Sequence, residues 1–220
     1  VPLWIFRLRP VTVANAVGAL LGGAIFGGFF LLTLYMQQVL GYSPLQAGVA
    51  FLATAGTTIP AAAISQALIT RLGVKPVMLT GLVLMAFAYF WYTQLPTEGH
   101  FWTDLFIPFF ASGFGLAFIF IPLSLAALTV VEDRMAGISS GLLNTSQQIG
   151  GALGVAIMST IATTYSETLL EEGESQADAF TSGYDRAFWV AAAFMVAGFV
   201  ITLVVLRNRD VPTQEPEAAP

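Results

Sequence analysis

The sequence predicts an all-α membrane protein, a bundle of six transmembrane helices. The first observation is composition: 56% of the 220 residues are hydrophobic and only 10% are charged, whereas about 25% are charged in a typical soluble domain. The second is the mean hydropathy of +0.78. The third is that the apolar residues gather into stretches of about 20 or more, the length that a helix needs to cross a hydrocarbon core roughly 30 Å thick.

Six stretches meet this length, and none contains Asp, Glu, Lys, Arg or His. Each carries Gly or Pro, which membrane helices tolerate better than soluble helices do. Buried helices of a soluble protein would show a polar face with a period of 3.6 residues, and these stretches do not. The predicted spans are residues 11–40, 44–70, 76–95, 105–131, 135–165 and 187–206.

The basic residues predict the orientation, because short loops rich in Lys and Arg stay in the cytoplasm. Seven of the eight lie before the first span, after the sixth, or in the loops after the second and fourth; they are Arg7, Arg9, Arg71, Lys75, Arg134, Arg207 and Arg209. The opposite loops are acidic, and the longest carries only Arg186. We therefore expect a multi-pass protein of the cytoplasmic (inner) membrane with both ends of this segment inside.

The two ends of the chain are predicted to lie outside the bilayer core. Residues 1–10 place Trp4 beside Arg7 and Arg9, which is typical of a segment at the lipid headgroups but also fits a simple linker. Residues 207–220 are rich in Pro and Glu, which predicts a disordered cytoplasmic tail. Since the sequence opens on Val1 and shows no signal peptide, we expect it to belong to a longer polypeptide.

Three pairs of glycines follow a G-x-x-x-G spacing, which places both members on one helix face. Small residues allow membrane helices to pack closely, and smooth faces also suit bundles that rock against each other. The pairs are Gly18 with Gly22, Gly23 with Gly27, and Gly150 with Gly154.

Polar side chains form stripes on three of the predicted spans, and a stripe at lipid depth must face protein or water. Two readings stay open: the stripes line a central path for a substrate, or they hydrogen-bond to neighbouring helices at about 0.6 kcal/mol per contact. The cavity candidates are Phe26, Phe30, Thr33 and Gln37 on the first span, Thr54 and Thr58 on the second, and Ser140, Asn144 and Gln147 on the fifth.

Several classes of function are disfavoured by what the sequence lacks. With no cysteine, and no acid, base or histidine in a predicted span, we expect no metal site, no cofactor and no proton-relay residue in the spans. Ser112 lies among glycines, as a nucleophile could, but no general base is in reach within the spans, so we expect no enzyme activity. The net charge of −5 and the apolar composition also argue against a nucleic-acid partner.

Two long strings resemble one branch of a known family. LYMQQVLGYSPLQAG at residues 34–48 and SGLLNTSQQIGGALG at residues 140–154 are similar to segments in the C-terminal half of major facilitator superfamily transporters, in the fourteen-span drug:proton antiporter branch. The resemblance covers nearly the whole chain. It implies that the six spans are the C-terminal six-helix bundle of such a transporter.

The loop at residues 66–75 resembles a decayed copy of the superfamily signature G-x-L-A-D-R-x-G-R-K. Arg71, Gly73 and Lys75 match it, whereas Gln66, Thr70 and Val74 depart from it. Such decay is usual in the C-terminal repeat of the family. A purely structural reading also stays open, in which Gly73 ends a helix and the two cations anchor it at the headgroups.

The resemblance implies a secondary active exporter of amphipathic drugs or metabolites, driven by protons through alternating access. Its expected partners are membrane lipids, a small amphipathic substrate, protons and the missing N-terminal half of the same polypeptide, where the family tends to carry its coupling carboxylates. The alternatives are an exporter of an endogenous metabolite, siderophore or lipid precursor, and a six-span scaffold that transports nothing.

Overall fold

The computed structural model describes residues 3–128, 131 and 133–207. Within that part of the chain, six segments are long and apolar enough to cross a membrane, which confirms the predicted all-α membrane bundle. A 3-10 turn, Leu3–Arg7, precedes the first helix, and π-helical turns, Tyr35–Val39 and Phe101–Leu105, follow α1 and precede α5. The helices are α1 (Arg9–Leu34), α2 (Pro44–Ala50), α3 (Leu52–Leu72), α4 (Val74–Tyr92), α5 (Phe106–Leu128), α6 (Asp133–Glu171) and α7 (Gln176–Val205).

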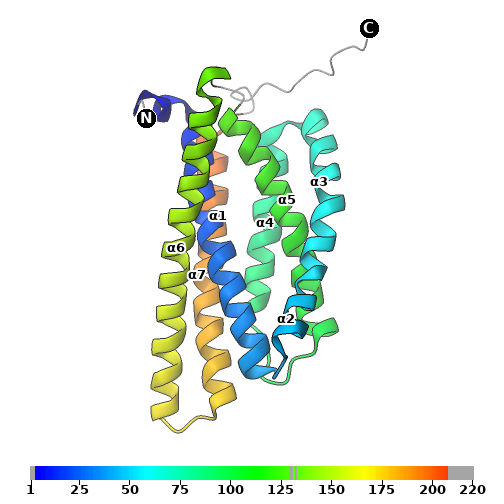
Figure 1. Ribbon diagram of the computed structural model, residues 1–220, viewed down its shortest axis with the longest axis vertical. Helices are drawn as coiled ribbons and strands as arrows, with labels where there is room; N and C mark the ends of the chain where they lie inside the picture. Colours follow the sequence, from blue (N-terminus) through cyan, green and yellow to red (C-terminus); the bar gives the residue numbers. More distant parts are fainter. Residues whose placement is uncertain (1–2, 129–130, 132, 208–220) are drawn as a thin grey trace.

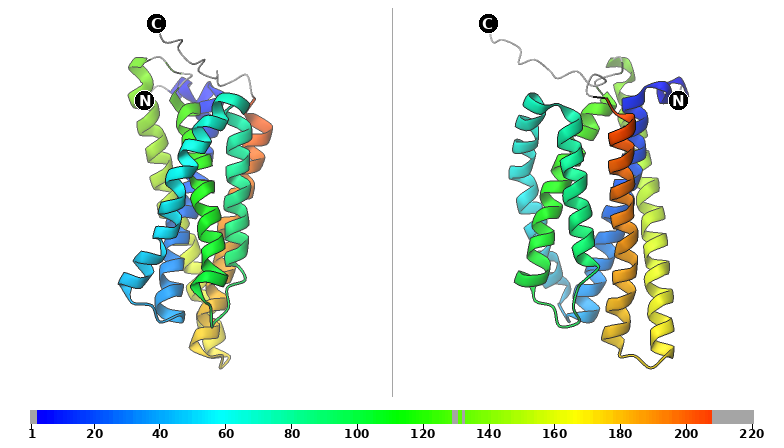
Figure 2. Two further views of the ribbon diagram at one scale, coloured as in Figure 1. Left: turned by 90° about the vertical axis from the view of Figure 1, so that its right-hand side faces the viewer. Right: turned by 180° about the vertical axis from the view of Figure 1, so that it is seen from behind.

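The helices alternate in direction and form two groups of three (Figures 1 and 2). One group is α1, α6 and α7; the other is α3, α4 and α5, with short α2 leading into α3. Contacts of α4 with α7 and of α1 with α5 join the groups. The start of α1 and the end of α7 lie at the same end of the bundle (Figure 1).

The two ends of the bundle differ in charge. We call one the basic end, because Arg7 ends the 3-10 turn and Arg9 begins α1 there, and α3 turns into α4 there between Arg71 and Lys75. The opposite, acidic end carries the turns at 41–43, 93–100 and 172–175. This matches the loop order expected from the sequence. Most of the predicted tail, residues 208–220, lies outside the described residues.

The closest helix packing in the bundle is the crossing of α1 and α6. A Cβ added at Gly22 would lie against the carbonyl oxygen of Gln147, one at Gly150 against that of Ala19, and one at Gly154 against the backbone of Gly23. The two backbones therefore touch directly, which only glycine permits.

The remaining paired glycines also lie in this crossing. A Cβ at Gly18 would come within 2.8 Å of Leu143 Cδ1, and one at Gly27 would meet Met158 and the backbone of Gly154. Gly23 faces both α6 and Phe194 of α7. The three G-x-x-x-G pairs thus all serve helix packing.

Local sequence signals explain where α2 begins. Ser43 Oγ accepts a hydrogen bond from Gln46 N at 3.3 Å, and Gln46 Oε1 accepts one from Ser43 N at 2.8 Å. This reciprocal capping box is followed by Pro44 in the first turn, where its missing N–H costs nothing. Gly41 precedes it with φ of 69°, which favours glycine. Much of the string at residues 34–48 is therefore explained as a helix start.

Two helices extend much further at the acidic end than the apolar stretches predict. Residues 166–186, expected as the longest loop, are helical except at 172–175. At about 1.5 Å per residue, the 39 residues of α6 span roughly 58 Å, beyond the ~30 Å hydrocarbon core. Hydropathy detects only the part of a helix that suits lipid, so the polar end of this hairpin was missed. The hairpin projects past the other helices (Figure 1).

The segment before α1 lies against the bundle. Ile5 is fully buried, whereas Trp4 and Phe6 are exposed by 50% and 41%. The carbonyl oxygen of Phe6 accepts a hydrogen bond from Thr12 Oγ1 at 2.7 Å, which ties the segment to α1. This geometry suits the headgroup location predicted for residues 1–10.

The crossing of α1 and α6 predicts a position-specific effect of alanine on stability. Gly150→Ala should destabilise the chain by about 1–3 kcal/mol, because the new methyl group must push the helices apart. Gly141→Ala is the matched control on the same helix: a Cβ there meets nothing within 4 Å, so its helix propensity should leave stability unchanged or raised by up to ~1 kcal/mol. Thermal unfolding in detergent measures both, and equal melting temperatures would contradict the packing account.

Candidate functional site

A cleft of about 530 Å³ opens in the middle of the bundle, between α1, α3, α5 and α6. It lies where α3 and α6 make no extensive contact with each other, and Phe26 and Phe120 at its border are 47% and 48% exposed. Its volume is within the usual range for small-molecule sites, about 300–1,000 Å³. We call it the central cleft. Its lining is mainly apolar, with four polar side chains: Thr58, Asn144, Gln147 and Gln148.

The central cleft brings together four of the nine cavity candidates, from three different helices: Phe26, Thr58, Asn144 and Gln147. The backbone of Gln147 lies at the crossing of α1 and α6, where its carbonyl group packs against Gly22. Its side-chain Nε2 is buried and meets no hydrogen-bond partner among the described residues. A buried amide donor without a partner costs about 1–3 kcal/mol.

The neighbouring Ser146 faces α1 instead. Its Oγ donates to Asn15 Oδ1 at 2.8 Å, while Asn15 Nδ2 donates to the carbonyl oxygen of Val11 at 2.8 Å. Asn15 is 6% exposed and Ser146 is half-buried, so this link between α1 and α6 is partly buried. On α6, Asn144, Gln147 and Gln148 thus line the central cleft, whereas Ser146 hydrogen-bonds to a neighbouring helix.

The polar stripe on α3 faces α5. Thr54 Oγ1 donates to the carbonyl oxygen of Phe109 at 3.2 Å, Thr58 Oγ1 to that of Gly113 at 3.2 Å, and Ser65 Oγ to that of Ala117 at 3.4 Å. The acceptors recur every fourth residue, as neighbours on one helix face do. Thr54, at 6% exposure, is thus outside the central cleft, and Thr58 lies between the cleft and α5.

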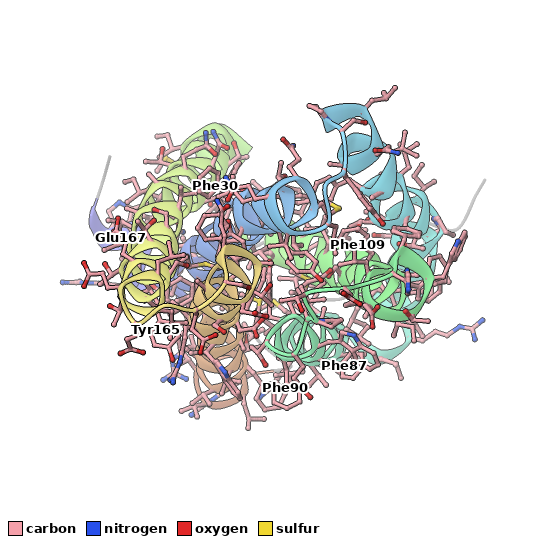
Figure 3. All side chains as sticks on the ribbon, turned by 90° about the horizontal axis from the view of Figure 1, so that it is seen from below. Phe30, Phe87, Phe90, Phe109, Tyr165 and Glu167 are labelled. Carbon is pink, nitrogen blue, oxygen red and sulfur yellow. The ribbon has the colours of Figure 1, made fainter. Side chains whose placement is uncertain are left out.

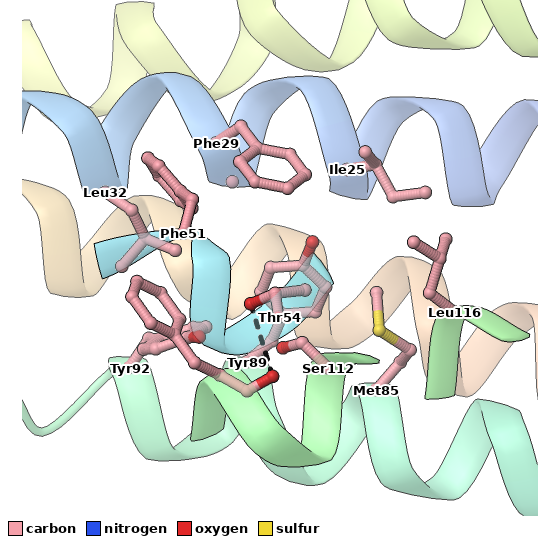
Figure 4. Close-up of a pocket in the computed structure, with 12 residues that line it drawn as sticks. Ile25, Phe29, Leu32, Phe51, Thr54, Met85, Tyr89, Tyr92, Ser112 and Leu116 are labelled. Carbon is pink, nitrogen blue, oxygen red and sulfur yellow. Dashed lines mark hydrogen bonds between the residues drawn. The ribbon is translucent and has the colours of Figure 1, made fainter. Parts of the chain in front are cut away.

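A smaller cavity of about 20 Å³ continues from the central cleft, with which it shares Ile25 and Leu116. Thr54, Ser112, Tyr89 and Tyr92 line it together with apolar side chains (Figure 4). Tyr89 Oη donates to the carbonyl oxygen of Ala24 at 2.6 Å. Its volume matches about one water molecule, so it extends the cleft without admitting a larger ligand.

Ser112 lies in this small cavity, and the side chains that line it include no His, Asp, Glu or Lys. A serine nucleophile needs such a base within hydrogen-bond reach.

The other cavity candidates lie outside the central cleft. Thr33 Oγ1 donates within α1 to the carbonyl oxygen of Phe29, and Ser140 Oγ within α6 to that of Gly137. Gln37 is half-buried in the π-helical turn after α1. Phe30, 42% exposed, borders a second cleft near the acidic end.

The remnant of the signature loop has a structural explanation for two of its three residues. Gly73 joins α3 to α4 with φ of 87°, a conformation that disfavours other residues. Lys75 Nζ donates to the carbonyl oxygen of Leu203 at 2.8 Å, near the end of α7, where cations stabilise the helix. Arg71 is exposed, as expected of a headgroup contact.

Asp185 is a half-buried acid that the apolar stretches did not reveal, because they place it in a loop. It lies in α7, with the backbone of Leu95 beside its carboxylate, and Oδ1 is buried without a hydrogen-bond partner in the described part of the chain. The adjacent Arg186 turns away and stacks on Tyr165, 4.9 Å from the ring centroid. Asp185 is the tenth residue of α7, in the polar first part of the helix that hydropathy does not detect, so only a prediction of the full length of α7 could have found it.

Comparison with known proteins identifies one matching family. The model described as Major Facilitator Superfamily matches residues 14–220.

Individual relatives point to resistance and export. The chain is 33% identical over 161 residues to a lincomycin resistance protein of Streptomyces lincolnensis, covering 73% of this chain and 33% of that protein. It is 30% identical over 184 residues to a puromycin resistance protein of Streptomyces alboniger, covering 82% and 37%. It is 30% identical over 206 residues to a cephamycin export protein of Amycolatopsis lactamdurans, covering 93% and 41%. The chain thus spans about a third to two fifths of the length of these relatives.

The two sides of α6 predict different reactivity for single cysteines, which this cysteine-free chain allows to be placed one at a time. Cysteine at Asn144 or Gln148 should react with a water-soluble maleimide, because both side chains line the central cleft. Cysteine at Ser146 should react at least about tenfold more slowly, because it faces Asn15. Equal rates at the three positions, measured by mass shift, would contradict the assignment of the two sides of α6.

Proposed function

The chain belongs to the major facilitator superfamily, and on that premise we propose that it forms one six-helix half of a proton-coupled exporter of amphipathic compounds. The observation that carries the proposal is the central cleft, which combines an apolar lining with the amides of Asn144, Gln147 and Gln148. Apolar walls with a few fixed polar groups suit ligands that are partly apolar and partly polar. The three relatives are described as lincomycin resistance, puromycin resistance and cephamycin export proteins, in keeping with such substrates.

The depth of the central cleft supports a role in alternating access. Leu21, Gly22 and Phe26 line it from the middle of α1, so the cleft is far from both ends of the bundle. Transporters of this kind hold their substrate near the midplane and expose it to each side in turn as one bundle rocks against the other. We propose that the open side of the cleft is completed by an N-terminal half, of which this chain is the C-terminal counterpart.

Proton coupling is the part of the proposal that rests most on the family. The side chains that line the central cleft include no acid, base or histidine, and proton transfer at lipid depth needs such a group. We therefore assign the main coupling carboxylates to the N-terminal half. This chain would contribute substrate contacts and one moving bundle.

Transport by the full-length protein tests the cleft. Gln147→Leu keeps the approximate volume and removes the amide, so export should fall about tenfold, as expected for the loss of one buried hydrogen bond. Thr145→Val is the matched control, since Thr145 Oγ1 bonds only within α6 to Gly141 and is not among the cleft-lining residues. The measurement is substrate efflux from proteoliposomes with and without an imposed pH gradient. Unchanged efflux by Gln147→Leu would contradict the proposed site. Efflux at the same rate with and without the gradient would contradict proton coupling.

The charge difference between the ends predicts the orientation, with the basic end in the cytoplasm. An epitope tag at the turn around Gly73 should be inaccessible from outside intact cells. The same tag in residues 172–175, at the acidic end, should be accessible and serves as the positive control. Surface labelling of the Gly73 tag alone would reverse the assigned topology.

A further inference from the structure

A second cleft, of about 380 Å³, lies near the acidic end between α1, α6 and α7. It is formed beyond the crossing of α1 and α6, where Gly27 meets Met158. We call it the outer cleft. Figure 3 views the bundle from this end, with Phe30 of α1 and Glu167 of α6 labelled.

Three aromatic rings and one carboxylate dominate the lining of the outer cleft. Phe30, Phe180 and Tyr184 supply the rings, and Glu167 is the one charged side chain among the lining residues. Glu167 has no ion-pair partner within the described residues. Aromatic faces and an unpaired carboxylate are the two groups that attract an organic cation.

The polar groups of the outer cleft are held in place by helix-to-helix hydrogen bonds. Tyr184 Oη donates to Gln38 Oε1 at 2.6 Å and so links α7 to the end of α1. Ser166 Oγ donates to the carbonyl oxygen of Ala179 at 3.0 Å and so links α6 to α7. The rings and the carboxylate therefore stand on a fixed frame instead of a loop.

The charges around the outer cleft favour a cation over an anion or a zwitterion. The tip of the α6–α7 hairpin adds Glu171, Glu172, Glu174 and Asp178. The nearest basic side chain, Arg186, stacks on the Tyr165 ring and is absent from the lining of the outer cleft. A mouth lined with one sign of charge raises the local concentration of the opposite ion.

We propose that the outer cleft is a second binding site, for a monovalent amphipathic cation whose aromatic or alkyl part packs on Phe30, Phe180 and Tyr184 while its charge lies at Glu167. The site is separate from the central cleft, since the two share no lining residue. In export, this site would be the last contact of the compound before release. That role rests on the proposed export function, whereas the binding itself does not.

Equilibrium binding to the purified full-length protein tests the site, with benzyltriethylammonium as the probe and neutral N,N-diethylbenzamide as its uncharged counterpart. Glu167→Gln should weaken binding of the cation about fivefold and leave the amide unaffected. Glu171→Gln removes the same charge about one turn further along α6 and does not line the cleft, so it should change cation binding less than about twofold. Equal losses of cation affinity in the two variants would show that the effect comes from the overall negative charge of this end, and would overturn the proposed site.

A second pair of variants locates the bound probe. Thr163→Trp should fill the outer cleft and abolish binding of both compounds there, provided that gel filtration shows a folded protein. Asn144→Leu with Gln147→Leu alters only the central cleft, so binding at the outer cleft should persist even where export is lost. Failure of the proposed transport function therefore leaves this test intact.

The proposed site also requires that the outer cleft be open to water in the full-length protein. A cysteine at Thr163, which is exposed, should react with a water-soluble thiol reagent and be protected by the cationic probe. Absence of reaction in the full-length protein would show that lipid or the other half covers the cleft, and the proposal would then fail.

Discussion

The structure depends on one constraint, the direct backbone contact between α1 and α6. In lipid, apolar side chains gain little by leaving equally apolar acyl chains, so helices associate through close packing and hydrogen bonds. Gly22, Gly150 and Gly154 supply that packing, and the partly buried hydrogen bond between Asn15 and Ser146 fixes its register. The central cleft lies beside this crossing and the outer cleft beyond it, so the crossing sets the shape of both.

Within the second group of helices, α3 is held to α5 by hydroxyl groups. Thr54, Thr58 and Ser65 donate to carbonyl groups of α5 that are four residues apart, and a Cβ at Gly113 would collide with Thr57, so α3 approaches α5 closely on one narrow stripe. The rest of α3 is largely exposed, Ile59 by 76%. The wall of the central cleft that α3 forms is thus attached on one side only, which suits a bundle that works against a partner.

The sequence predicted the architecture well because lipid imposes a simple rule: a spanning helix must be long and apolar. It could not predict which way a polar stripe faces. The spacing places Thr54 and Asn144 on particular faces of their helices, but it does not show which helix or cleft lies opposite each face. It also could not predict tertiary contacts, such as the one between Lys75 and the end of α7, and it missed the acid Asp185, which lies in a helix whose polar extension hydropathy cannot detect. The glycine pairs were the most informative motif, since all three lie at the crossing of α1 and α6.

The central claim is that the cleft between α1, α3, α5 and α6 holds the exported compound. The most direct measurement is an electron cryo-microscopy map of the full-length protein with an exported compound bound. The account predicts density for the compound against Phe26, Asn144 and Gln147, with the other half of the transporter closing the open side. Density confined to the α4 and α7 face, with the central cleft filled by side chains of the other half, would contradict it.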